Sequence, residues 1–252
     1  MSYIDTLFNL SGRTAIVTGS SKGIGFACAN MLAQAGCRVF GLARTEPQSD
    51  VYFDHRICDI RNQKNLTQMI HEILLLSSKT DILVNAAGIT NPAPGQDCSD
   101  DQLDTFLQTL ELNLIASYRL INLLVPNMKE YRSGSIINIT SIGAEFGFPG
   151  NPGYVASKGG LKMLSKAMAN DLGTFGIRVN NIAPGYIKTD MTQKSFNDAK
   201  LHQQRLRNMI LPRWGTVDDV AKAAVFLASD ASSYITGADL FVDGGWSAKG
   251  MV

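Results

Sequence analysis

Apolar residues in this chain follow two alternating patterns: short β-branched runs, and longer stretches in which they recur at helical spacing. The short runs predict seven strands, at residues 13–18, 38–43, 56–59, 81–84, 136–140, 177–183 and 237–242. Helical spacing predicts helices at about residues 27–35, 62–77, 100–130, 154–174 and 217–229. Strands and helices that alternate throughout predict an α/β fold, a single doubly wound domain over residues 1–252 with helices on both faces of a seven-stranded, mainly parallel sheet.

Three stretches depart from this alternation. Residues 46–55 are polar, contain a proline and show no convincing helix, so the crossover between the second and third strands is close to the minimum for a parallel pair. The helical region at 100–130 is expected to break near Glu111. Residues 193–211 are polar and mixed in charge. Together with the loop before them they are a candidate substrate lid, at about residues 186–211.

A glycine-rich turn joins the first strand to its helix. The turn reads Gly19-Ser20-Ser21-Lys22-Gly23-Ile24-Gly25. Between a strand and a helix, glycines let the backbone approach a pyrophosphate, and the helix N-terminus offers free N–H groups and a positive dipole. The turn therefore predicts a dinucleotide site, with a plain tight turn as the alternative.

The end of the second strand bears on which dinucleotide binds. In folds of this kind an acidic residue there holds a ribose 2′-hydroxyl, whereas an arginine accommodates a 2′-phosphate. This chain has Arg44 and no acid at that position, and Lys22 adds a second cation in the glycine turn. These two cations favour NADP(H), unless Arg44 is an ordinary solvated loop residue.

Further cofactor contacts are expected where other strands end, because ligands of open α/β sheets bind outside the carboxyl ends of the strands. The candidates after the third, fourth and sixth strands are Asp59, Ile60, Asn85, Ala86, Gly88, Pro184 and Gly185. Small residues after the fourth strand would let a cofactor lie against it. Asp59 has a second interpretation of equal weight, as the N-cap of the helix at 62–77.

The stretch after the fifth strand brings three reactive groups together. Ser141 follows the strand, and Tyr154 and Lys158 stand four residues apart in the next predicted helix. That spacing places a phenol and an ammonium on one helix face, where the ammonium would lower the pKa of the phenol. With the Ser141 hydroxyl on the same substrate oxygen, the stretch predicts a proton-transfer site for a carbonyl or an alcohol. The alternative is an ordinary surface pair of tyrosine and lysine.

Composition disfavours several classes of function. The 252 residues carry a net charge of +1, which gives no electrostatic case for nucleic acid or a membrane surface. The four cysteines, Cys28, Cys37, Cys58 and Cys98, are irregularly spaced and suggest neither a metal site nor a disulfide framework. A reducing cytoplasm fits this cysteine pattern best. The N-terminus does not read as a secretion signal, and no apolar run approaches the roughly 20 residues of a membrane span.

Together these segments resemble the short-chain dehydrogenase/reductase family in its short, one-domain Rossmann form, over nearly the whole chain. The matching segments are Thr18 to Gly25, Asn85-Ala86-Ala87-Gly88, Asn113, Ser141, Tyr154-Val155-Ala156-Ser157-Lys158 and Pro184-Gly185. Ser141 and Tyr154 are 13 positions apart (154 − 141), which is the family's usual separation. Several independent motifs in the right order are far more specific than any one of them.

The resemblance implies a role for each catalytic residue. Tyr154 would be the general acid in reduction and the base in oxidation, and Ser141 would orient the substrate oxygen. Lys158 would lower the pKa of the tyrosine and hold the hydroxyls of the nicotinamide ribose. Asn113, which by itself is typical of a satisfied core residue, would position a water that connects Lys158 to solvent.

The same resemblance implies hydride transfer with a nicotinamide dinucleotide and no need for a metal. The cations Arg44 and Lys22 make NADP(H) the preferred cofactor, with NAD(H) as the other possibility. The nicotinamide carboxamide would meet backbone near Ile187, in the loop from Pro184 to Thr189. Many members of the family are homotetramers built on the helix with the tyrosine–lysine pair and on the C-terminal strand. Residues 241–252 are apolar and glycine-rich enough to suit that assembly.

Two substrate classes compete within the family. The chain is similar to 3-oxoacyl-acyl-carrier-protein reductases, which dock an acidic carrier through basic residues near the active-site rim. Arg132 matches one such position, but Phe175 occupies the other. Two segments look more like sugar and polyol dehydrogenases, Arg213-Trp214-Gly215 and Asp243-Gly244-Gly245-Trp246. We therefore favour a sugar, polyol or general ketone, with the acyl reductase as second choice. A non-catalytic dinucleotide sensor is a remote alternative. Such a protein would be free to lose the tyrosine or the lysine, and this chain has both.

Overall fold

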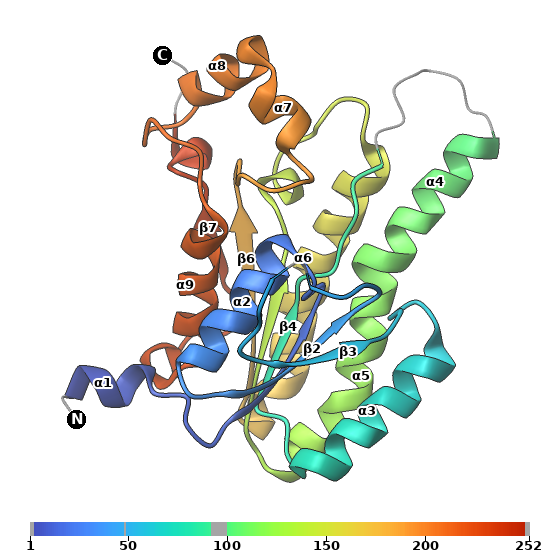
Figure 1. The fold of residues 1–252 in the computed structure, drawn as a ribbon, viewed down its shortest axis with the longest axis vertical. Helices are drawn as coiled ribbons and strands as arrows, with labels where there is room; N and C mark the ends of the chain where they lie inside the picture. Colours follow the sequence, from blue (N-terminus) through green and yellow to red (C-terminus); the bar gives the residue numbers. More distant parts are fainter. Residues whose placement is uncertain (1–2, 48, 92–99, 250–252) are drawn as a thin grey trace.

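Seven parallel strands lie in the order β3-β2-β1-β4-β5-β6-β7 in the computed structural model, which describes residues 3–47, 49–91 and 100–249 (Figure 1). The strands are β1 (Thr14–Thr18), β2 (Arg38–Ala43), β3 (Asp54–Ile57), β4 (Ile82–Asn85), β5 (Gly134–Ile139), β6 (Ile177–Pro184) and β7 (Asp239–Val242). Each neighbouring pair is parallel. The predicted doubly wound α/β fold is confirmed.

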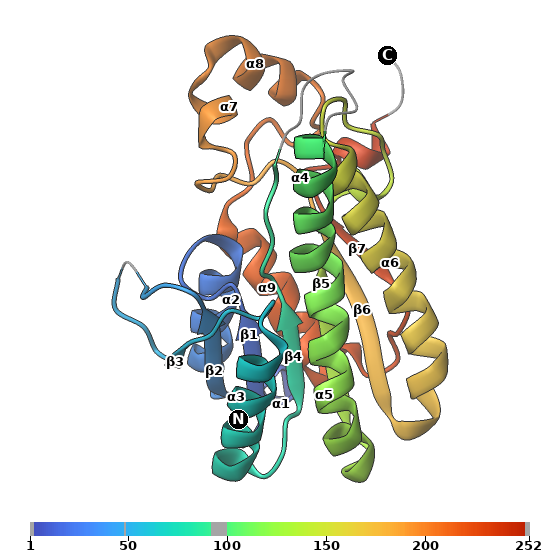
Figure 2. The ribbon, with the colours of Figure 1, turned by 90° about the vertical axis from the view of Figure 1, so that its right-hand side faces the viewer.

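Helices cover both faces of the sheet (Figure 2). On one face lie α3 (Gln63–Ser77), α4 (Asp100–Leu110), α5 (Ala116–Glu130) and α6 (Pro152–Leu172), and on the other α2 (Gly23–Gln34) and α9 (Val217–Ala228). The short helices are α1 (Tyr3–Phe8) near the N-terminus, and α7 (Gln193–Asn197) and α8 (Ala199–Arg207) beyond the carboxyl ends of the strands. Among the helices that the structure describes, none has the length and apolar character needed to cross a bilayer.

The core forms two clusters because alternate side chains of a strand point to opposite faces of the sheet. In β1, Ile16 packs in the cluster that includes residues of α3 and α5. Its neighbours Ala15 and Val17 pack in the other cluster, with residues of α2 and α9. The whole of β1 is buried. Burial on both faces explains why the central strands are continuous apolar runs.

One local feature, the extent of β3, differs from the predicted pattern. β3 spans Asp54–Ile57 instead of residues 56–59, because its pairing with β2 begins at Phe40 and Asp54, and an edge strand tolerates polar residues. The described residues between β2 and β3 contain no helix, as the polar composition indicated. The α-helix is interrupted near Glu111, as expected, and a π-helical turn (η1, Glu111–Ile115) joins α4 to α5. Of the cysteines, Cys98 lies outside the described residues and the other three are free thiols.

Gly25 provides a test of the packing between the glycine turn and α2. A Cβ added at Gly25 would lie 2.8 Å from the Thr18 carbonyl oxygen and closer still to that of Gly19. Gly25→Ala should therefore lower the free energy of unfolding by about 1–3 kcal/mol, although alanine is the better helix former. Gly159→Ala in α6 is the matched control, since no atom lies within 4 Å of its added Cβ. Urea titrations followed by circular dichroism measure both variants, and equal stabilities would contradict the packing argument.

Candidate active site

The carboxyl end of β5 and the start of α6 bring the predicted reactive groups together. Ser141 follows the strand, and its Oγ accepts a hydrogen bond from the Gly143 N–H at 2.9 Å. Helix α6 begins at Pro152, a position where the missing N–H of proline removes no helical hydrogen bond. Tyr154 lies in its first turn and Lys158 one turn later. Ser141, Tyr154 and Lys158 all line one cavity of about 110 Å³.

The Lys158 ammonium is buried at the end of β5. Lys158 is only 5% exposed, and its Nζ donates a hydrogen bond to the Ile139 carbonyl at 2.8 Å. Burial disfavours the charged form and lowers the pKa of Lys158 to about 8. The ammonium lies 5.9 Å from the centre of the Tyr154 ring. The two groups therefore face the same cavity, as their spacing predicted.

The pKa of Tyr154 does not follow the predicted direction. Burial raises the pKa of the phenol above its usual value, and a hydrogen bond with Ser141 opposes that rise without reversing it. The prediction considered only the ammonium beside the phenol, whereas the structure buries both groups and binds the Lys158 ammonium to the Ile139 carbonyl. The phenol is consequently protonated near neutral pH, which is the form that a general acid needs.

Asn113 lies in the π-helical turn and is completely buried. Its Nδ2 donates to the Ile89 carbonyl at 2.9 Å and to Ser157 Oγ at 3.0 Å, and its Oδ1 accepts from the Ile89 N–H at 2.8 Å. The side chain thus ties the segment after β4 to the residue that precedes Lys158. A role for Asn113 in positioning a water stays a prediction.

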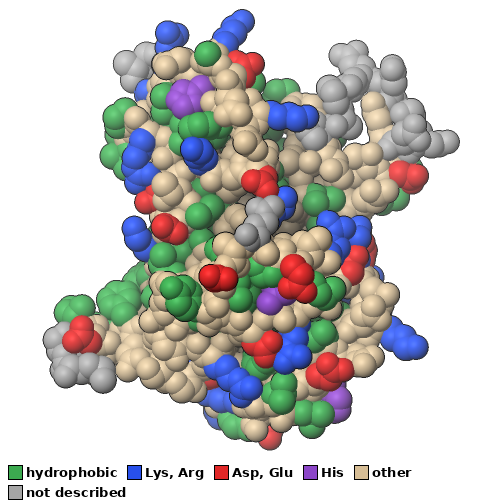
Figure 3. Space-filling model, viewed as in Figure 1, with side chains coloured by type: hydrophobic (Ala, Val, Ile, Leu, Met, Phe, Trp, Pro, Cys, Tyr) green, Lys and Arg blue, Asp and Glu red, His purple; other side chains and the backbone are tan. Residues whose placement is uncertain are grey.

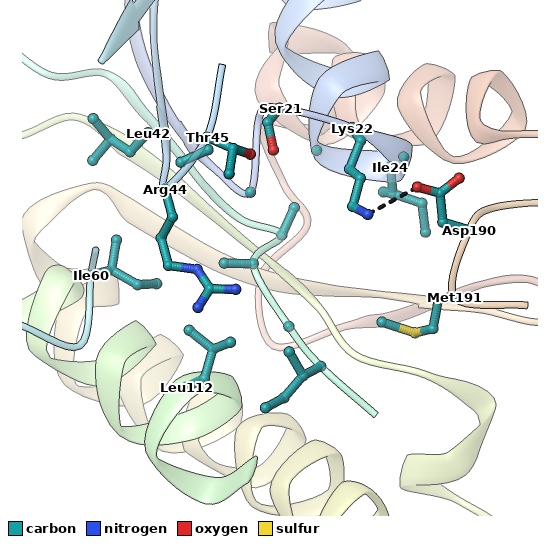
Figure 4. A pocket seen from close by; sticks show the side chains of 18 of the residues that line it. Ser21, Lys22, Ile24, Leu42, Arg44, Thr45, Ile60, Leu112, Asp190 and Met191 are labelled. Carbon is teal, nitrogen blue, oxygen red and sulfur yellow. Dashed lines mark hydrogen bonds and ion pairs between the residues drawn. The ribbon is translucent and has the colours of Figure 1, made fainter. Parts of the chain in front are cut away.

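A larger cavity of about 360 Å³ adjoins the first, and the two share lining residues (Figure 4). The glycine turn forms part of its wall, where Gly19 and Gly23 have φ values of +70° and +61° that glycine adopts without strain. Lys22 is the N-cap residue of α2, and no side chain caps the helix. The N–H groups of the first turn of α2 therefore remain available for an anion. This arrangement fits the pyrophosphate of a dinucleotide.

Most residues predicted to bind the cofactor line these cavities. The larger is lined by Gly19, Ser21, Lys22, Gly23, Ile24, Gly25, Arg44, Asp59, Ile60, Ala86, Gly88 and Thr189, and the smaller by Ile24, Ala86, Gly88, Tyr154, Lys158, Pro184, Gly185, Ile187 and Thr189. Asn85 is the exception. It is buried within the sheet, where its Nδ2 donates to Asn138 Oδ1 at 2.8 Å. The structure therefore places Asn85 between two strands and not at a cavity.

The two predicted phosphate-binding cations are placed differently. Arg44 points into the larger cavity, toward the side where Ile60 and Leu112 lie (Figure 4). Within the described ranges, no hydrogen bond or ion pair holds its guanidinium. Lys22 instead pairs with Asp190, with 2.9 Å between Nζ and Oδ2. Arg44 is thus oriented toward a ligand, whereas Lys22 is joined to the loop after β6.

Asp59 does not cap α3. The cap is Asn62, whose Oδ1 accepts a hydrogen bond from the Asn65 N–H at 3.1 Å. The Asp59 carboxylate instead accepts hydrogen bonds from Arg61, at 3.0 Å from Nε and 2.6 Å from Nη2, and these lower the pKa of Asp59. The N-cap interpretation is wrong, and Asp59 lines the cavity as half of an ion pair.

Several residues lining the cavities were not predicted. They are Leu42, Ala43, Thr45, Cys58, Ala87, Ile89, Leu112, Asp190 and Met191 in the larger, and Ile139, Thr140, Met191 and Thr192 in the smaller. Most are direct neighbours of predicted residues at strand ends, so a wider window at each end would have found them. Leu112 has no such signal, because it reaches the cavity from the π-helical turn.

Comparisons with known proteins agree with this geometry. A family model described as "Enoyl-(Acyl carrier protein) reductase" matches residues 19–247. The 3-oxoacyl-acyl-carrier-protein reductase FabG of Chlamydia trachomatis is 40% identical over 247 residues, which cover 94% of this chain and 98% of that protein. The 2-dehydro-3-deoxy-D-gluconate 5-dehydrogenase of Pseudoalteromonas atlantica is 37% identical over 253 residues, covering 96% and 98%. A crystal structure of a gluconate 5-dehydrogenase from Burkholderia cenocepacia in complex with NADP and tartrate has a TM-score of 0.91 at 32% identity, covering 98% and 100%.

The buried ammonium makes stability depend on pH in a defined direction. The pKa of Lys158 is lowered from 10.5 to about 8 on folding, so between these values the unfolded chain binds more protons, and stability rises with pH. Lys158→Met removes this titration. The wild type should gain roughly 2 kcal/mol of unfolding free energy from this group between pH 7 and pH 10, and the variant should not gain it. Urea titrations at both pH values measure the change, with Lys64→Met on the exposed side of α3 as control. A difference that is the same at both pH values would contradict burial of the charge.

Proposed function

The chain belongs to the short-chain dehydrogenase/reductase family, and we propose that it interconverts a carbonyl and a secondary alcohol of a small sugar acid, sugar or polyol. It is an oxidoreductase of the NAD(P)-dependent type, and NADP(H) is the preferred cofactor. The observation that carries the proposal is the single cavity lined by Ser141, Tyr154 and Lys158, which adjoins the cavity over the glycine turn.

The proton-transfer chemistry follows from the three side chains. A bound nicotinamide supplies or accepts the hydride. In the direction of reduction, the Tyr154 hydroxyl donates its proton to the carbonyl oxygen, and the Ser141 hydroxyl donates a hydrogen bond to the same oxygen. The Lys158 ammonium, one helical turn away, stabilises the phenolate that remains. In oxidation the phenolate takes the proton of the alcohol.

The smaller polar substrate is favoured over a carrier-bound acyl chain. Arg132, the residue that matches a carrier-docking position, lies two residues before β5 and donates a hydrogen bond to the Thr174 carbonyl at 2.9 Å. It therefore lies at the amino ends of the strands, whereas Ser141 lies at their carboxyl ends. A single chain does not place Arg132 at the rim of its own active site. The 40% identity to the FabG of Chlamydia trachomatis keeps the acyl reductase as the second candidate.

We propose that the segment at about residues 186–211 covers the substrate. Helices α7 and α8 stand beyond the carboxyl ends of the strands (Figure 1). Thr189 and Met191 line both cavities, which connects the start of this segment to the site. Ile187, at the start of the segment, pairs with Gly215, just beyond its end, and this pairing holds the two ends of the segment together.

We further propose a cytoplasmic homotetramer assembled through α6 and β7, as in many members of the family. Both elements carry large exposed apolar side chains, Met163 on α6 and Phe241 on β7, which are 60% and 36% exposed. Association in this form would cover both side chains. The three described cysteines are reduced and buried, which suits the cytoplasm.

A substrate panel with a Tyr154→Phe variant tests the function. The wild type should oxidise sugar acids or polyols with NADP⁺, and Tyr154→Phe should lower kcat by about 100- to 10,000-fold because it removes the transferred proton. Calorimetric titration should show a far smaller effect on NADPH affinity than on kcat. A 3-oxoacyl thioester with NADPH is the competing substrate. Turnover of that thioester alone would favour the acyl reductase, and an unimpaired Tyr154→Phe would exclude the phenol as the acid.

Cofactor preference is tested at Arg44. Arg44→Ala should raise KM for NADPH by roughly 10-fold or more, because a hydrogen-bonded ion pair with the 2′-phosphate is lost. KM for NADH should change by less than about twofold, since NADH has no such phosphate. Lys64→Ala, on exposed α3, controls for a general loss of positive charge. Steady-state kinetics with both cofactors decide, and equal effects on both would remove the phosphate role.

A further inference from the structure

The link between β2 and β3 is held in place without a crossover helix. It packs on α2 through apolar contacts, with the rings of Phe26 and Phe53 edge to face at 6.2 Å between centroids. The Tyr52 N–H donates a hydrogen bond to Asn30 Oδ1 on α2 at 2.9 Å. The link thus covers the same face of the sheet as α2, and β3 follows it directly.

His55, on β3, lies at the centre of this arrangement. Its side chain is only 7% exposed. Nε2 lies 3.1 Å from the Thr45 carbonyl, to which it donates, and Nδ1 lies 3.4 Å from Ser20 Oγ. One imidazole therefore connects the glycine turn, through Ser20, with the segment that leaves β2, through Thr45.

The space around His55 leaves little freedom. Gly41 is its partner in the pairing of β2 with β3. A Cβ added at Gly41 would lie 2.6 Å from Ser20 Oγ and closer still to the Phe53 ring. Ser20 is completely buried and Phe53 nearly so. The buried His55 ring lies beside this close packing, and its nitrogens reach Ser20 and the Thr45 carbonyl, with the exposed Glu46 carboxylate 4.0 Å from Nε2.

Thr45 directly follows Arg44, the residue whose side chain points into the larger cavity. The other cation of that cavity, Lys22, is already paired with Asp190. The position of the Arg44 guanidinium thus depends on the backbone of residues 44–45. The hydrogen bond from His55 to the Thr45 carbonyl holds that backbone in place. We propose that His55 is a positioning residue that sets Arg44 for the 2′-phosphate and so decides the preference for NADP(H). This inference rests on the proposed function, in which Arg44 contacts that phosphate.

Two substitutions of His55 separate the contacts. The amide of His55→Gln reaches the place of Nε2 and can still donate to the Thr45 carbonyl, whereas that of the shorter His55→Asn reaches only the place of Nδ1. Calorimetric titrations with NADPH, NADH and adenosine 2′,5′-bisphosphate give the dissociation constants without turnover. His55→Asn should weaken NADPH and the bisphosphate by roughly fivefold or more, the value of one hydrogen bond, and NADH by less than twofold. His55→Gln should stay within twofold of the wild type.

A double-mutant cycle identifies the route of the effect. If His55 acts by placing Arg44, then His55→Asn should not weaken NADPH further in an Arg44→Ala background. His71→Ala, an exposed histidine on α3, is the control and should change neither cofactor. Thermal unfolding of every variant shows which of them fold. If His55→Asn does not fold, a loss of the NADPH preference in a folded His55→Gln overturns the inference, and its retention supports it.

The remaining outcomes are also decisive. An equal loss of NADPH and NADH in His55→Asn would show a general support of the fold and would overturn the positioning role. Unchanged binding of both would overturn it too. A wild-type chain that binds neither dinucleotide would refute the proposed function itself, an outcome that differs from every other one because the substitutions are not involved.

Discussion

The burial of the Lys158 ammonium is the constraint on which the rest of the site depends. A charge removed from water costs free energy unless it is bound, and here the Ile139 carbonyl binds it at 2.8 Å. That contact joins α6 to the end of β5. Deeper in α6, Ser165 Oγ accepts from Asn138 Nδ2 at 2.8 Å and lies 2.6 Å from Asn181 Oδ1. The helix is therefore anchored to two strands, and an unfavourable buried charge is kept where the chemistry needs it, at some cost in stability.

Local geometry explains what could be predicted from the sequence. The turn at residues 19–25 and the pair Tyr154 and Lys158 owe their arrangement to neighbours within a few residues, so spacing alone places them. The side-chain contacts of Asn85 and Lys22 could not be predicted from spacing. Their partners lie 53 and 168 positions away, at Asn138 and Asp190. The raised pKa of Tyr154 was missed for a similar reason, because burial depends on packing that no spacing reveals.

The amino and carboxyl ends of the strands distinguish the two substrate classes that the sequence left open. Every residue assigned to hydride and proton transfer lies at the carboxyl ends of the strands, as in open α/β sheets generally. Arg132 lies at the amino end of β5 and its guanidinium is bound to the Thr174 carbonyl. A carrier protein held there would face away from Ser141 of the same chain. Docking of an acyl carrier through Arg132 would therefore have to involve a neighbouring subunit. A free sugar acid needs only the residues at the carboxyl ends of the strands in one chain.

The connection between the glycine turn and the loop after β6 is weaker than its geometry suggests. Lys22 and Asp190 are 2.9 Å apart, but both side chains are 59% exposed. Exposed ion pairs contribute about 0–1 kcal/mol, so this one cannot fix the loop after β6. Thr192 does more. It is partly buried, and its Oγ1 donates to the Ile187 carbonyl at 2.5 Å and accepts from the Thr189 N–H at 3.0 Å. The loop is thus shaped from within, and a phosphate that draws Lys22 away from Asp190 leaves the wall of the substrate cavity in place.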